Sequence, residues 1–117
     1  MAGPIWGEIR GPITVTIPSG VGTSSGVVIQ GSHYFSLFVP ILTSAVLSFI
    51  GPTGASDWTA FRTQAGAVIT AQPTAGTGAM WLDSNALSFL IGYFGEVRIS
   101  AAAAQASGRD FIWHMKG

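Results

Sequence analysis

The 117-residue chain contains no cysteine and very little charge. Without cysteine it can form no disulfide and no thiolate centre, and its redox compartment is left open. Charged residues make up 9% of the sequence, whereas about 25% is typical of soluble domains. Five basic and five acidic residues give a formal net charge of zero, so repulsion between copies is weak. This composition favours a protein that functions inside an assembly.

Basic patches and long apolar runs are also missing. The five scattered Lys and Arg residues cannot neutralise a row of phosphates, which argues against nucleic acid as a direct partner. A membrane-spanning helix needs about 20 mainly apolar residues, and the best candidate, Phe35–Ile50, is shorter and is interrupted by Pro40. The N-terminus lacks the basic and apolar regions of a signal peptide. We therefore expect no membrane partner and no nucleic-acid partner.

The dominant feature is a stretch without any Asp, Glu, Lys or Arg, which runs from Gly11 to Ser56. Its centre holds two apolar runs, Tyr34–Val39 and Ala45–Ile50, with Pro40 after the first. Solvated faces of a protein normally carry charge. The stretch is therefore either almost wholly interior, or its surface is covered by other subunits.

Short runs with a period of two recur along the whole chain. Ile13–Ile17 alternates apolar residues with threonine, which is typical of a half-buried strand. Turn residues separate the runs every six to twelve positions, and no segment favours a stable helix. The pattern predicts an all-β fold of about 8–10 short strands, an antiparallel β-sandwich of jelly-roll type. We expect an extended N-terminal arm over residues 1–12 and one sandwich domain over residues 13–117.

Several runs carry more specific expectations. In Tyr34–Val39 both faces are largely apolar, which predicts a strand covered on both sides. Residues 51–57 are rich in Gly and Pro and predict a loop. Phe89–Phe94 is expected to be a second buried run. The pattern directs five further side chains of the C-terminal region inward, namely Val97, Ile99, Phe111, Trp113 and Met115.

No arrangement of residues predicts catalysis, a metal site or a cofactor. A serine from the Ser24–Ser25 pair could be combined with His33 and Asp57, but the sequence has no Gly-x-Ser-x-Gly elbow. The two histidines lack a metal-binding spacing. The small-residue loop after Ile17 lacks the lysine of a phosphate-binding loop. The sequence therefore predicts a protein that is not an enzyme.

Sugar binding is the main alternative that the residues leave open. Trp58 and Trp81 lie next to loops, where a β-sandwich can offer aromatic surfaces to a saccharide. Planar polar partners for sugar hydroxyls are scarce, because Asn85 is the one asparagine in the chain. A membrane-active protein is a third class, which dependence on detergent and helical circular dichroism would reveal.

Read in order, the runs resemble a family of small all-β structural proteins of tailed bacteriophages. The layout starts with ITVTIPSGVGTSSG, continues with YFSLFVP, LSF and SDWTAFRTQAGAVIT, and ends with VRIS, a small-residue loop and an aromatic strand. This chain departs from the family in its low charge around Asp57 and in its phenylalanine-rich segment Phe89–Phe94. The resemblance carries no catalytic motif.

The resemblance implies a virion component, assembled in the host cytoplasm: a capsid decoration or cement protein, or a head–tail or tail accessory subunit. Its partners would be the major capsid protein or other virion proteins and further copies of itself, and the decoration role implies a trimer. The alternative is a glycan- or receptor-binding module of the phage head or tail. Pro-stiffened loops and exposed aromatics are favoured as contacts, and we expect partner contacts at Ile5, Trp6, Pro52, Trp58 and Pro73.

Overall fold

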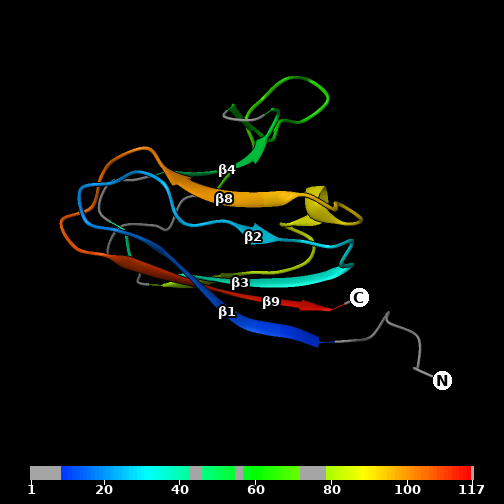
Figure 1. The fold of residues 1–117 in the computed structure, drawn as a ribbon, viewed down its shortest axis with the longest axis horizontal. Coiled ribbons are helices and arrows are strands. Elements are labelled where there is room, and N and C mark those ends of the chain that lie inside the picture. The colour runs from blue at the N-terminus through cyan, green and yellow to red at the C-terminus, as the bar shows by residue number, and fades with distance from the viewer. Residues whose placement is uncertain (1–8, 43–45, 55–56, 72–78, 117) are drawn as a thin grey trace.

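The chain forms two antiparallel β-sheets, as seen in a computed structural model that describes residues 9–42, 46–54, 57–71 and 79–116. Nine strands lie in these residues, and no α-helix does. A single turn of 3-10 helix, η1 (Ser88–Leu90), precedes the last two strands. Figure 1 shows the sheets as two layers, with β2, β4 and β8 in one and β1, β3 and β9 in the other. The predicted all-β fold with antiparallel pairing is confirmed.

The first sheet has four strands in the order β1-β9-β3-β7. Their bounds are Ile9–Ile17 for β1, Arg109–Lys116 for β9, Tyr34–Val39 for β3 and Met80–Leu82 for β7. The pairing of β1 with β9 brings the beginning of the described chain against its end, from Ile9 opposite Lys116 to Ile17 opposite Arg109. The register shifts between Arg10 and Ile13, so β1 contains a bulge there.

The second sheet has the order β2-β8-β4-β5, and β6 also pairs with β4. The strands are β2 (Val27–Val28), β8 (Glu96–Ala101), β4 (Leu47–Pro52), β5 (Trp58–Ala60) and β6 (Thr70–Ala71). Ser24 extends this sheet beyond β2. Its main-chain N–H donates to the Ile99 oxygen at 2.9 Å, and its hydroxyl accepts from the Ile99 N–H at 3.0 Å.

Both sheets contribute to one apolar core. Phe49 of β4 and Trp113 of β9 come from different sheets, and their ring centroids lie 6.3 Å apart. Phe89 then links Phe49 to Phe61, with centroid distances of 5.3 and 5.4 Å. The five C-terminal side chains that the alternation directs inward are all buried, as predicted: Val97, Ile99, Phe111, Trp113 and Met115.

In these elements the structure contradicts one sequence prediction and moves two boundaries. The loop predicted at residues 51–57 starts later, because Gly51 and Pro52 still pair with β5. The expectation that Phe89–Phe94 is a buried run is wrong: Leu90 is buried, but Ile91 and Phe94 are exposed. A 3-10 turn and bends place side chains on all sides, so a run of apolar residues is not held on one face. β1 begins at Ile9, within the segment expected to be an arm.

Candidate functional site

The outward side of the four-stranded sheet is unusually rich in aromatic side chains. In β3 the alternation buries Phe35, Leu37 and Val39, and it leaves Tyr34, Ser36 and Phe38 on the other side. In β9 the same alternation puts Asp110, Ile112, His114 and Lys116 outward. We call this surface the aromatic face, and it consists of Tyr34, Ser36, Phe38, Trp81, Asp110, Ile112, His114 and Lys116.

The strand register gathers the largest of these side chains into one row. Phe38 is the cross-strand partner of Trp81 on β7 and of Ile112 on β9. The Phe38 and Trp81 rings meet edge to face, with centroids 5.3 Å apart, and the His114 ring lies 5.9 Å from Trp81. Such ring pairs are favourable in themselves, yet Trp81 remains 57% exposed. A large aromatic side chain in this position is available for contact with another molecule.

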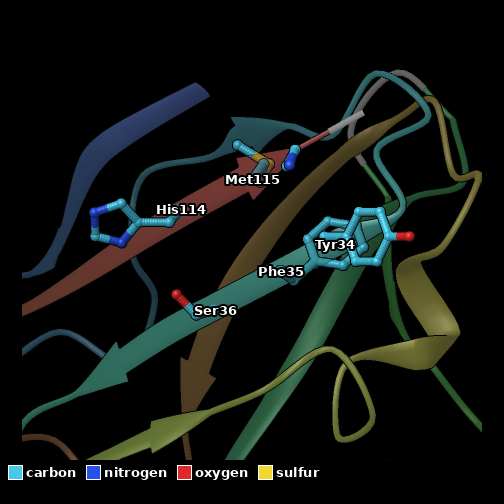
Figure 2. Close-up of a pocket in the computed structure, with 6 residues that line it drawn as sticks. Tyr34, Phe35, Ser36, His114 and Met115 are labelled. Carbon is cyan, nitrogen blue, oxygen red and sulfur yellow. The ribbon is translucent and has the colours of Figure 1, made fainter. Parts of the chain in front are cut away.

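A shallow groove lies beside this row. Tyr34, Ser36, His114 and Lys116, together with Phe35 and Met115, line a depression of about 220 Å³. Figure 2 shows His114 on β9 and Tyr34 on β3 well separated, with the short Ser36 side chain leaving space between them. The groove therefore exists because the small Ser36 occupies a position on β3 between two large aromatic residues.

Among the described residues, the groove shows no hydrogen-bonded pair of a nucleophile and a base. Ser36 and His114 are cross-strand partners, but among the hydrogen bonds of the described residues none joins them, whereas an activated serine needs a base within bonding distance. No acidic side chain lines the groove. Of the two serines considered from the sequence, Ser24 is buried, and its hydroxyl donates to the carbonyl of the other, Ser25, at 2.8 Å. Its bonds to Ile99 and Ser25 give Ser24 a structural role.

Two residues predicted as partner contacts come together on the second sheet. Pro52 of β4 pairs with Trp58 of β5, and Pro52 is exposed. The Arg98 guanidinium lies 4.0 Å from the centroid of the Trp58 ring and covers part of it. Arg98 is in turn 3.7 Å from the Glu96 carboxylate. The other three predicted contacts, Ile5, Trp6 and Pro73, lie outside the described residues.

Sequence reasoning missed most of the aromatic face. It expected β3 to be covered on both sides, but Tyr34 is 60% exposed in this chain, so that expectation is wrong for a single copy. The signal was present in Tyr34, Ser36 and Phe38, which put aromatic residues on the side of the strand where polar residues are usual. Trp81 was singled out as a possible sugar contact, and the structure places it on the surface.

Within the part of the chain that the structure describes, no group of three or more His, Asp or Glu side chains could hold a metal ion. No helix of that part is long and apolar enough to cross a membrane. No protein-family model and no curated protein sequence matches the chain. The resemblance to phage structural proteins and the absence of an enzymatic activity therefore remain predictions.

Proposed function

We propose that the fold is a β-sandwich of jelly-roll type. A jelly roll distributes eight strands over two sheets through two Greek keys. Setting β6 aside, the chain has four strands in each sheet, in the orders β1-β9-β3-β7 and β2-β8-β4-β5. The chain changes sheet after most strands, and its first and last strands are neighbours. This alternation supports the jelly-roll assignment.

We propose that the protein is a non-enzymatic structural component of a tailed-phage virion, namely a capsid decoration or cement protein. One observation carries the proposal: the charge-free stretch is not wholly interior. Val21, Val28, Tyr34 and Ile41 all lie in it, and each is at least 44% exposed. Of the two explanations that the sequence leaves for this stretch, cover by other subunits accounts for these side chains.

A cement protein stabilises a shell because it buries apolar surface across several capsid subunits. Each Å² of apolar surface removed from water contributes about 25 cal/mol, although association entropy offsets part of this. Many copies on one shell multiply a modest contribution per contact. The exposed Pro52 beside Trp58 offers a stiff edge for such a contact, and the predicted contacts Ile5, Trp6 and Pro73 would add to it.

The proposal is tested with capsid shells of a phage that encodes this chain. Shells with the protein bound should withstand higher temperature or lower salt than bare shells, measured by light scattering and electron microscopy. Trp58→Ala should weaken co-sedimentation with shells. Phe94→Ser is the matched control, because Phe94 is exposed on a loop outside the predicted contacts. Failure of the folded protein to bind shells would contradict the decoration role.

A glycan-binding module is the second candidate, and the exposure of Trp81 beside the groove favours it. The hydroxyls of Tyr34 and Ser36 and the amine of Lys116 could hydrogen bond to a saccharide. Glycan-array binding that Trp81→Ala abolishes, without any binding to shells, would favour this candidate over the structural one.

A further inference from the structure

The aromatic face carries opposite charges at its two ends. Asp110 and Lys116 both lie on the outward side of β9 and both are exposed. Lys116 is six positions after Asp110, which corresponds to about 20 Å along a strand. Asp110 is held on this face by the Thr16 hydroxyl, which donates to its carboxylate at 2.7 Å. The face therefore has one acidic end and one basic end.

Between these charges lie a ridge and a depression. The ridge is the row of Trp81, Phe38 and Ile112. The depression is the groove at Ser36 and His114: Ser36 lies two residues before Phe38 on β3, and His114 lies two residues after Ile112 on β9. One more carboxylate lies close to this face, that of Asp83, directly after β7. It accepts a hydrogen bond from the Ala86 N–H within its own turn.

A single two-fold axis would bring the opposite charges of two such faces together. Such an axis lies in the plane midway between the two stacked sheets, runs perpendicular to the strands and passes level with Trp113. It sets each strand antiparallel to its own copy. Asp110 of one copy then faces Lys116 of the other, about 10 Å from the axis at each end. The ridge of each copy faces the groove of the other. An axis parallel to the strands would instead oppose Asp110 to Asp110 and Lys116 to Lys116.

We propose that the aromatic face is an isologous docking surface for a second copy of this chain. Isologous contacts are self-complementary by symmetry, so every favourable pair occurs twice. Stacked sheets lie about 10 Å apart and are rotated by about 30°. The long Lys116 side chain can span the resulting distance to Asp110 of the other copy. This pairing gives a dimer, so the trimer implied by the family resemblance would need a different surface.

The inference rests on the proposed function in one respect, namely that the protein acts as part of an assembly. It assigns a different partner to each of the two sheets. The aromatic face binds the second copy, whereas Pro52 and Trp58 on the second sheet stay free for the shell. Solution mass and shell binding are therefore separate measurements. A monomer that binds shells would overturn this inference and leave the proposed function standing. A dimer that ignores shells would do the reverse.

The experiment is sedimentation equilibrium of the full chain and four variants at low salt. The wild type should dimerise. Asp110→Lys and Lys116→Asp should each weaken the dimer by about tenfold or more, because each turns two attractive pairs into repulsive ones. The double variant, with both charges exchanged, should recover most of the affinity. Asp57→Lys, an exposed acid outside the aromatic face, is the control and should behave as the wild type.

Ser36→Phe provides a second route, because it fills the groove that receives the ridge and should abolish the dimer. Far-UV circular dichroism reports whether each variant retains the β-structure of the wild type. A wild type that is monomeric at every concentration would overturn the inference. Single variants that dimerise like the wild type would overturn it too, as would a double variant no stronger than either single variant.

Discussion

The hydroxyl of Tyr93 donates a hydrogen bond to the Glu96 main-chain oxygen at 3.0 Å. Burial, and then the nearby charge of Glu96, raise the pKa of this hydroxyl above its ordinary value of 10.0. The neutral form is therefore the one that the fold stabilises. Because the folded-state pKa is raised, the neutral Tyr93 hydroxyl adds to the free energy of unfolding. This added stability is fully present below the unfolded-state pKa and is lost as pH rises through the folded-state pKa.

We predict that the free energy of unfolding falls with increasing pH in the alkaline range above about pH 10, and that Tyr93→Phe reduces this dependence. Urea unfolding at a series of pH values measures it. Tyr34→Phe removes the other tyrosine of the chain and is the control, which should retain the full dependence. If Tyr93→Phe and the wild type lose stability in parallel, Tyr93 is not the responsible group.

At the same scale, the two tryptophans that the sequence singles out beside loops have different surroundings. Trp58 is partly covered by the Arg98 guanidinium, whereas Trp81 is 57% exposed and its ring meets the Phe38 ring in a T-shaped contact. Nothing in the local sequence distinguishes them, because each follows a loop and begins or lies within a short strand. The difference arises from other strands of each sheet. β8, which is separated from β5 by β4, supplies an arginine beside Trp58, and β3, the partner of β7, supplies a phenylalanine beside Trp81.

Among the elements, β1 depends on its bulge. Gly11 lies at the register shift with φ of 116°, a conformation that L side chains rarely adopt. A Cβ at this position would lie 2.6 Å from the main-chain oxygen of Trp113 on β9. The backbone of a neighbouring strand cannot move aside without loss of pairing, so glycine is required here.

We predict that Gly11→Ala destabilises the protein by at least about 1–3 kcal/mol, measured by urea unfolding. Gly20→Ala is the matched control. Gly20 also has a positive φ, of 74°, but a Cβ there would meet nothing within 4 Å. The control therefore carries conformational strain without the steric clash and should cost less. Equal losses for the two variants would show that the contact with β9 is unimportant.

β3 shows how far an element can be predicted. Its bounds, Tyr34–Val39, agree with the sequence expectation, as does the burial of Phe35, Leu37 and Val39. Alternation is a local property, so it is visible in the sequence. Whether the opposite side is covered is not local, since it depends on what lies above the sheet. For this reason the exposure of Tyr34 could not be predicted.

At the scale of the whole molecule, the pairing of β1 with β9 joins residues from opposite ends of the chain. Such non-local contacts require closure of a long loop before they contribute stability. β9 also lies between β1 and β3, so it completes the four-stranded sheet. The sheet cannot form fully until the C-terminal strand is in place.

We predict that the main refolding phase is slow, in the range of about milliseconds to seconds that is usual for all-β domains. Stopped-flow tryptophan fluorescence, to which Trp113, fully buried in β9, contributes together with the three other tryptophans, follows this phase. Removal of residues 109–116 should leave the chain unfolded, because Phe111, Trp113 and Met115 are lost from the core. Microsecond refolding, or a folded truncated chain, would contradict this account of the assembly of the sheet.

The sequence by itself determined the fold class, the approximate position of most strands and the inward side chains of β8 and β9. These follow from alternation and turn residues, which act over a few positions. Only the tertiary structure decided the aromatic face, because Phe38, Trp81 and His114 come from three strands that are distant in sequence. Strand order and register place them together, and no local pattern encodes either.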